Sequence, residues 1–326
     1  MTLPTVPDPR KLGSLVFDLC EVLIVFFRKW SYKSAAVTIL SVSVFARAVP
    51  VFSQHKLRAD LNEEIITIPA SIHDHEYHLE TTLFRPNKVD RFPLIVIAHG
   101  TNKPPPGVKY QQPRERSIVL SETFVRQGFA VAIPMRRGYG SSAGEQVRIK
   151  NNDLTAYGLE NALDIQQAIR FLAKQPYVDP NKIIISGWST GGLAAMAYLS
   201  EPDDGVLGVI NFHGGVRPHN FKHDPLLTAR IDAFVRYAKT THLPSLWFYT
   251  ANDHSSRPPF IKRLHKAYVS NGGNAVLVQL GPFKQDGHMI SQDRDGLPFW
   301  QEKVRAFLTE LTNEAAKSAG QDASKQ

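Results

Sequence analysis

The chain is poor in cysteine, with Cys20 alone among 326 residues. An intrachain disulfide is therefore excluded, and cysteine usage carries no information about the redox compartment. A dense run of lysine and arginine with interleaved aromatic residues is also missing, although the formal net charge is +8. That absence argues against nucleic acid as a partner, so we interpret the excess positive charge as favouring solubility or attraction to anionic surfaces.

Phosphate-loop and metal-ligand spacings are missing as well. The Gly-rich segment 136–142 (RRGYGSS) lacks the G-x-x-x-x-G-K-[ST] pattern, and we interpret it as a loop at the rim of an active site. His73 and His75 can share one strand face, but the sequence places no further ligand nearby, and an exposed hairpin is the simpler interpretation. We therefore predict no cofactor and no metal site.

Residues 1–53 differ in character from the rest of the chain. Residues 28–48 combine positive charge, about a dozen apolar residues and a small-x-small site, Ala46-Arg47-Ala48, which is typical of a secretory signal peptide. This pattern predicts export, to the periplasm or the medium. An uncleaved membrane anchor within residues 15–53, or two amphipathic helices packed on the domain, are the alternatives. The long preceding segment raises the hypothesis that translation starts downstream of Met1, near residues 23–28.

Beyond residue 60, apolar β-branched runs alternate with amphipathic segments, which predicts one α/β domain over residues 60–314. One helix within residues 214–241 leaves no room for a large lid. The tail, residues 315–326, is rich in Lys, Ser and Gln and is predicted to be disordered. Strands are expected at residues 64–69, 77–84, 92–101, 129–134, 182–186, 206–213, 244–250 and 275–280, with a turn at 71–76, and helices at 117–127, 154–175, 193–199, 226–238, 258–270 and 299–314.

The central feature of this domain is the segment 187–192, GWSTGG, between a buried strand and a helix. Strand, G-x-S-x-G and helix together are the context of a nucleophile elbow, a strained turn that lifts a serine hydroxyl above the sheet. Gly187 and Gly191 supply the space that such a turn requires. We predict that Ser189 is a nucleophile and that the N–H of Thr190, at the helix N-terminus, stabilises an oxyanion.

Two later residues complete a catalytic triad by their positions. Asp253 follows a buried strand directly, and His288 lies in the loop after the last strand. His288 would take the proton of Ser189, and Asp253 would orient the imidazole. His213, after the sixth strand, and Asp286, close to His288, are the rival base and acid.

The order of Ser189, Asp253 and His288 resembles that of the α/β-hydrolase superfamily, closest to its dienelactone hydrolase and prolyl-oligopeptidase-like branch. The further matching residues are Ala98-His99-Gly100, Arg137-Gly138-Tyr139-Gly140, Gly191-Gly192, Asn252 and Gly287. The resemblance covers residues 60–312 and implies a mostly parallel eight-stranded sheet with helices on both faces. It also implies a second oxyanion N–H after the third strand, from Thr101 or, as second choice, Gly100.

This resemblance implies a serine hydrolase that cleaves carboxylic esters, with a serine peptidase of the prolyl-oligopeptidase-like type as the alternative. Dienelactone hydrolases proper carry a cysteine nucleophile where this chain has Ser189, which argues against their lactone substrate. A binding protein that keeps the fold without the chemistry is a third hypothesis. The expected partner is a small-molecule ester or a short peptide.

The signal-peptide interpretation predicts the N-terminus of the mature protein. Removal of a signal peptide would leave a mature chain that lacks the apolar run before the small-x-small site Ala46-Arg47-Ala48. Intact-mass and N-terminal peptide analysis of the protein from its natural host would test this. A mature protein that retains residues 1–20 would contradict it.

Overall fold

The computed structural model describes residues 56–101 and 112–323, with side chains to residue 317. Both the proposed signal region and most of the expected loop 103–113 lie outside the described residues. The elements are a 3-10 turn η2 (Ala59–Leu61), strands β1 (Glu64–Ile72), β2 (His75–Phe84), β3 (Phe92–Ala98), β4 (Ala130–Pro134), β5 (Val178–Trp188), β6 (Val206–Phe212), β7 (Ser245–Thr250) and β8 (Ala275–Leu280), helices α2 (Ile118–Arg126), α3 (Leu154–Leu172), α4 (Thr190–Tyr198), α5 (Pro225–Ala238), α6 (Pro258–Ser270) and α7 (Leu297–Ala323), and 3-10 turns η3 (Gly287–Met289) and η4 (Arg294–Gly296).

The eight strands form one sheet in the order β1-β2-β4-β3-β5-β6-β7-β8. Strand β2 pairs antiparallel with both β1 and β4, and all other neighbours are parallel. This confirms the mostly parallel eight-stranded sheet that the sequence predicts. Because β5 lies near the middle of the parallel part, the turn at its carboxyl end is surrounded by the ends of other strands.

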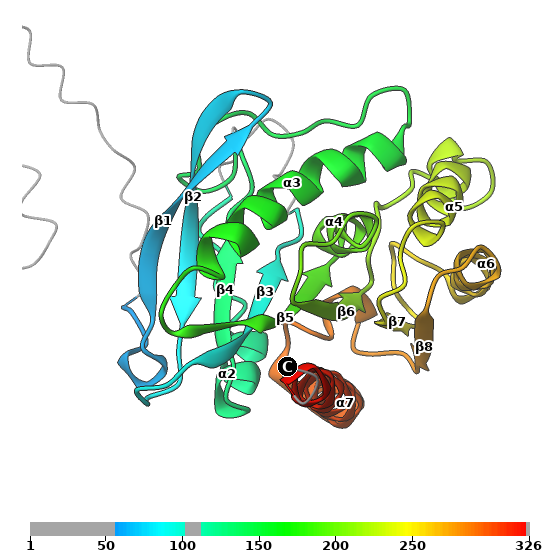
Figure 1. Ribbon diagram of the computed structural model, residues 1–326. Coiled ribbons are helices and arrows are strands. Elements are labelled where there is room, and N and C mark those ends of the chain that lie inside the picture. The colour runs from blue at the N-terminus through cyan, green and yellow to red at the C-terminus, as the bar shows by residue number, and fades with distance from the viewer. Residues whose placement is uncertain (1–55, 102–111, 324–326) are drawn as a thin grey trace, which may run out of the picture. The chain divides into compact units, whose positions relative to one another are not determined.

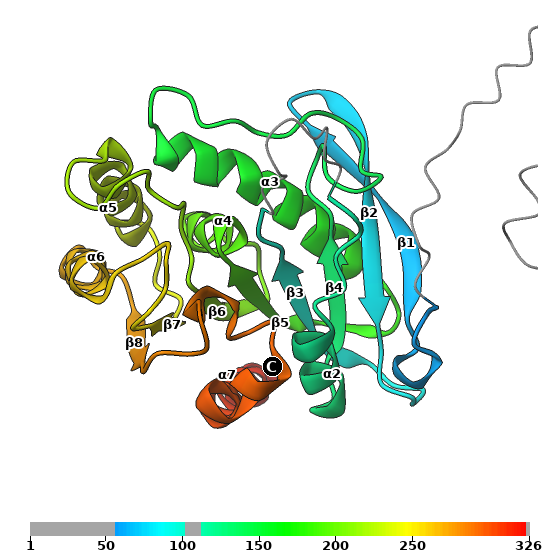
Figure 2. The ribbon, with the colours of Figure 1, turned by 180° about the vertical axis from the view of Figure 1, so that it is seen from behind.

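Helices cover both faces of the sheet (Figures 1 and 2). Helices α3, α4, α5 and α6 lie on one face, and α2 and α7 lie on the other. Strand β3 supplies both cores: Leu94 and Val96 pack toward the first group, whereas Ile95 and Ile97 pack toward the second. Because both faces of β3 are buried, its sequence is continuously apolar and does not alternate between apolar and polar residues.

Between β6 and β7 the described chain forms only α5, so the carboxyl ends of the strands are not covered by an inserted lid domain. Asp224 caps α5 by accepting the N–H of Leu226 at 2.9 Å, and Pro225 occupies the first helical turn. A search of the described helices finds none that is long and apolar enough to cross a membrane.

The structure differs from the sequence prediction at three places. Strand β5 begins at Val178, four residues before the expected strand 182–186. The first hairpin turn is confined to His73 and Asp74, both at positive φ, and the strands extend through much of the expected turn 71–76. Helix α7 continues to Ala323, through most of the tail that we expected to be disordered. Alanine is the best helix former, and Ala315, Ala316 and Ala319 occur in this extension, so an established helix can propagate through it.

A pair of identical substitutions tests the assignment of the core. Ile95→Ala removes a fully buried side chain and should lower the free energy of unfolding by about 2–5 kcal/mol. Ile65→Ala, at a residue that is 51% exposed, should change it by less than about 1 kcal/mol. Urea unfolding of both variants would measure the difference, and equal losses would contradict the assigned burial.

Candidate active site

Ser189 occupies the sharp turn between β5 and α4. Its φ of 55° and ψ of −124° are strained for a residue with a side chain, and such strain concentrates at functional sites. Three hydrogen bonds hold its backbone: its N–H donates to the Phe212 carbonyl at 3.0 Å, and its carbonyl accepts from Leu193 at 3.1 Å and Gly215 at 2.9 Å. The loops around the turn therefore maintain a conformation that an isolated peptide would avoid.

Close backbone packing places the end of β3 against this turn. A Cβ added to Gly191 would lie 2.0 Å from the Ala98 carbonyl oxygen. One added to Gly100 would lie 2.5 Å from the Trp188 ring and 3.2 Å from the Cβ of Ser189. These close contacts explain why positions 100 and 191 require glycine, and they bring Gly100 beside Ser189.

The structure brings Asp253 and His288 together, although 35 positions separate them in the chain. His288 Nδ1 lies 3.0 Å from Asp253 Oδ1, and the Asp253 side chain is fully buried while that of His288 is 13% exposed. When Asp253 is ionised, this contact places the imidazole proton on Nδ1 and leaves Nε2 as an acceptor. Among the described residues, no hydrogen bond joins the Ser189 hydroxyl to His288.

Asp253 stays ionised despite its burial. Desolvation alone would raise the pKa of its carboxyl group, but the hydrogen bond from His288 and the N–H of Ser255 lower it below the ordinary value. The second oxygen, Oδ2, is buried without a hydrogen-bond partner in the described part of the chain. The Asp253 carboxyl group is therefore ionised at neutral pH.

Two further side chains, those of Trp188 and Asn252, hold these loops in place. The indole N–H of Trp188 donates to the His288 carbonyl at 2.9 Å, and the two rings lie 5.4 Å apart. Asn252 bonds both the N–H and the carbonyl of Phe283, which ties the acid loop to the histidine loop. Trp188 is the variable residue of the elbow motif, and Asn252 entered the sequence analysis only as a residue of the family resemblance, so neither contact was predicted.

Of the rival residues, Asp286 has a different role in this structure. It caps η3 by accepting the N–H of His288 at 3.0 Å, and it forms an ion pair with His254 at 3.2 Å. The carboxylate of Asp286 therefore contacts the backbone of His288, whereas Asp253 contacts its ring.

His213, the rival base, is buried against the pair. Its ring lies 5.4 Å from that of His288, and its Nε2 accepts the N–H of Thr250 at 3.2 Å. Burial lowers the pKa of His213 to about 3, so its ring is neutral and Nε2 is already occupied.

His99 is a buried, neutral histidine that braces the loop after β3. It accepts the N–H of Arg136 at Nε2, 3.0 Å away, which leaves the proton on Nδ1 to donate to the Gly100 carbonyl at 2.7 Å. Burial, with the nearby charge of Arg136, lowers the pKa of His99 to about 3.

Thr101 and Thr190, the two expected oxyanion donors, lie side by side. Their hydroxyl groups are 2.9 Å apart, and that of Thr101 also contacts the Tyr139 hydroxyl at 3.0 Å. Thr190 is the first residue of α4, where helix geometry leaves its N–H without an intrahelical acceptor. Two segments that are distant in the chain therefore meet beside Ser189.

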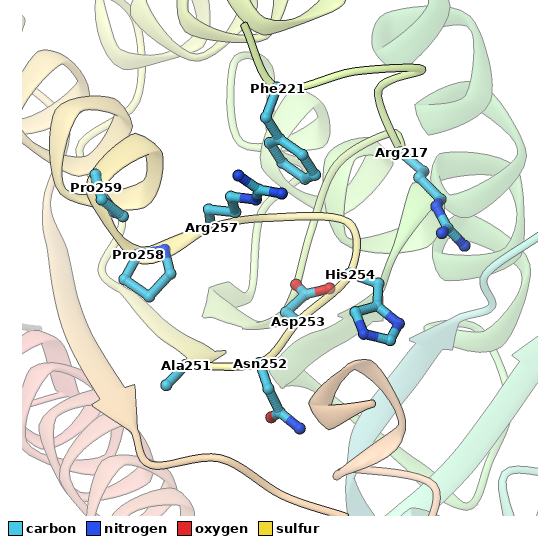
Figure 3. Close-up of a pocket in the computed structure, with 9 residues that line it drawn as sticks. All are labelled: Arg217, Phe221, Ala251, Asn252, Asp253, His254, Arg257, Pro258 and Pro259. Atoms are coloured by element: carbon cyan, nitrogen blue, oxygen red, sulfur yellow. The ribbon is translucent and has the colours of Figure 1, made fainter. Parts of the chain in front are cut away.

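A pocket of about 530 Å³ opens next to Asp253 (Figure 3). Arg257 lies over the Phe221 ring, 4.4 Å from its centroid, and Arg217 and His254 add further basic groups. Neither arginine forms an ion pair within the described ranges. The lining residues are Arg217, Phe221, Ala251, Asn252, Asp253, His254, Arg257, Pro258 and Pro259.

Within residues 56–101 and 112–323, no group of three or more metal-binding side chains is found. His73, considered above as a ligand, instead forms an exposed ion pair with Glu160 at 2.8 Å. His75 lies at the start of β2, with its ring edge-on to Tyr77.

The fold and this constellation define an α/β-hydrolase. The chain matches the model of the dienelactone hydrolase family over residues 79–321, and it belongs to that family. It is therefore a hydrolase. Among curated proteins, it is 28% identical to the quorum-quenching protein AidA of Acinetobacter baumannii over 130 residues, which are 40% of this chain and 38% of that protein. The match thus spans well under half of the relative.

Solved structures show the same fold at low sequence identity. Esterase Pf2001 of Pyrococcus furiosus is 15% identical, with a TM-score of 0.56 over 81% of this chain and 96% of its own. Est1E of Butyrivibrio proteoclasticus, solved with ferulic acid, is 19% identical, with a TM-score of 0.54 over 76% and 99%. The acylaminoacyl peptidase of Pyrococcus horikoshii is also 19% identical, with a TM-score of 0.55 over 78% of this chain and 42% of that one.

The two buried neutral histidines predict a loss of stability in acid. Their pKa values near 3 lie below the ordinary 6.5, so the stability they contribute is complete above about pH 6.5 and is lost as the pH falls toward 3. Each adds a slope of up to about 1.4 kcal/mol per pH unit. Asp164, whose pKa burial raises to about 6, opposes this trend between about pH 4 and 6.

A single variant isolates one of these slopes. His213→Asn suits the positive φ at this position and removes one titrating ring. Urea unfolding between pH 6.5 and 4 should therefore show a slope that is flatter by up to about 1.4 kcal/mol per pH unit than in the wild type. Identical slopes would mean that His213 is not a buried neutral group.

Proposed function

We propose that this chain is a serine hydrolase that cleaves carboxylic esters through an acyl-enzyme intermediate. Ser189 is the nucleophile, His288 the general base and Asp253 the acid that orients it. The N–H groups of Thr190 and Thr101 bind the oxyanion, with Gly100 as the second choice for the latter.

Each step of the proposed reaction uses one of these groups. Nε2 of His288 takes the proton of the Ser189 hydroxyl as its oxygen attacks the ester carbonyl, and the carbonyl oxygen becomes an oxyanion. The tetrahedral intermediate then collapses, and His288 returns the proton to the departing alcohol. Water, activated by the same imidazole, hydrolyses the acyl-enzyme and regenerates Ser189.

The observation that carries this proposal is the buried His288–Asp253 contact beside a strained serine. The 3.0 Å separation at Nδ1 supports the tautomer with a free Nε2, which is the form that a general base needs. The positive φ of Ser189 supports the role of nucleophile, because strain of this kind is maintained only by surrounding structure.

The charge of the adjacent pocket favours esters over peptides with a free amino terminus. Arg217 and Arg257 line it, His254 at its edge is paired with Asp286, and its one acidic residue, Asp253, is bonded to His288. An ammonium group would be repelled there, because like charges in a partly desolvated pocket interact unfavourably. A serine peptidase remains the alternative, since the acylaminoacyl peptidase has a similar fold.

Hydrolysis of p-nitrophenyl esters with acyl chains of increasing length tests the proposal. Ser189→Ala should lower kcat by about 10⁶-fold, and Asp253→Asn should lower it by about 10⁴-fold, because the amide favours the wrong imidazole tautomer. Ser141→Ala, at an exposed serine of the rim loop, is the matched control and should retain wild-type activity.

A fluorophosphonate probe separates the outcomes. Labelling of Ser189 together with ester turnover supports the proposal. Labelling without turnover of any ester would refute the ester assignment and favour the peptidase. If Asp286→Asn lowered kcat as strongly as Asp253→Asn, the assignment of the acid would be wrong.

A further inference from the structure

A buried arginine lies behind the threonines of the proposed oxyanion site. Arg136 follows β4 and is 1% exposed. Its Nη2 donates to the Thr190 hydroxyl at 3.1 Å, to the Thr101 hydroxyl at 3.4 Å and to the His99 carbonyl at 3.0 Å. One guanidinium nitrogen thus contacts both segments that meet beside Ser189.

No carboxylate contacts this guanidinium among the described residues. Its Nη1 donates to the amide oxygen of Asn161 at 2.7 Å, and its other partners are carbonyl and hydroxyl oxygens. The nearby carboxylate of Asp164 is instead bonded to Nε of Arg137 at 2.9 Å. A buried charge without a paired counter-charge is costly, and in a low dielectric its field acts strongly on any neighbouring charge.

The charge that forms nearest to Arg136 during ester hydrolysis is the oxyanion. The guanidinium donates to the hydroxyls of Thr101 and Thr190, and these belong to the residues whose N–H groups would bind that oxyanion. A fixed positive charge aimed at a position where negative charge develops stabilises the transition state more than the neutral ground state.

We propose that Arg136 is a positioning residue for the oxyanion site. It holds Thr101 and Thr190 together, and its positive charge, which no carboxylate of the described residues contacts directly, stabilises the oxyanion through them. This inference rests on the function proposed above. Arg136 does not touch the substrate, and it neither gains nor loses a proton in the reaction.

Asn161 allows the charge to be tested without changing Arg136. Asn161→Asp keeps the size of the side chain and places a carboxylate against the guanidinium, which should cancel its field. Asn161→Ala is the neutral control. Both variants lose the hydrogen bond from the Asn161 amide to the Tyr157 carbonyl, and alanine also removes the acceptor of Arg136 Nη1 without adding a charge. Thermal unfolding would monitor the stability of both.

Three measurements report on the oxyanion: kcat for a p-nitrophenyl ester, the affinity for a trifluoromethyl ketone, and the labelling rate of Ser189 by a fluorophosphonate. In Asn161→Asp each should fall about 10- to 100-fold relative to Asn161→Ala, with KM changed less than about threefold. Arg136→Lys should retain most of the kcat that Arg136→Met loses, because lysine keeps the charge.

Equal kcat, ketone affinity and labelling rate in Asn161→Asp and Asn161→Ala would overturn the proposal, because a purely structural Arg136 is insensitive to the added charge. This comparison also holds if Arg136→Met does not fold. The labelling rate separates the two proposals. If Ser189 of the wild type is labelled but the enzyme hydrolyses no ester, the ester assignment fails. The labelling rates of Asn161→Asp and Asn161→Ala still test the role of Arg136 in that case.

Discussion

The strained turn at Ser189 is the constraint on which the rest of the structure depends. A non-glycine residue at positive φ needs its backbone hydrogen bonds satisfied from outside, and β6, α4 and the loop after β6 supply them. The turn also needs space, and the approach of the Ala98 carbonyl to Gly191 shows how little remains. Because β5 pairs with β3 and β6, the same packing that tolerates the strain brings the neighbouring loops to the serine.

Two buried groups of opposite charge serve the site in the proposed mechanism. Asp253 stabilises the positive charge that forms on His288, and Arg136 stabilises the negative charge that forms on the carbonyl oxygen. Both are held by backbone groups and uncharged side chains, in addition to His288 in the case of Asp253. Neutral donors and acceptors hydrogen-bond a charged group and fix its position, but they add no opposite charge. The electric field of the group therefore still acts on charges that form during the reaction.

The strands and the loop positions of Ser189, Asp253 and His288 followed from local sequence, because buried parallel strands are continuous apolar runs and these loops follow them directly. The hairpin turn was expected to be longer than it is, since the turn propensity of residues 71–76 does not reveal that pairing continues to Ile72 and His75. The helical extension to Ala323 was not predicted, because the prediction considered the polar composition of the tail and not the helix propensity of its alanines. The segment 136–142 was assigned to a loop at the rim of an active site, and the burial of Arg136 was not predicted.

The sequence by itself determined the elements, the elbow at Ser189 and the order in which its candidate partners occur, because periodicity and glycine spacing are local properties. Only the tertiary structure decided which of Asp253 and Asp286 contacts the His288 ring, that His213 is buried and neutral, and that Arg136 lies behind Thr101 and Thr190. These facts depend on burial and on contacts between segments that are distant in the chain. Local residue patterns determine neither the burial of a side chain nor its contacts with distant segments.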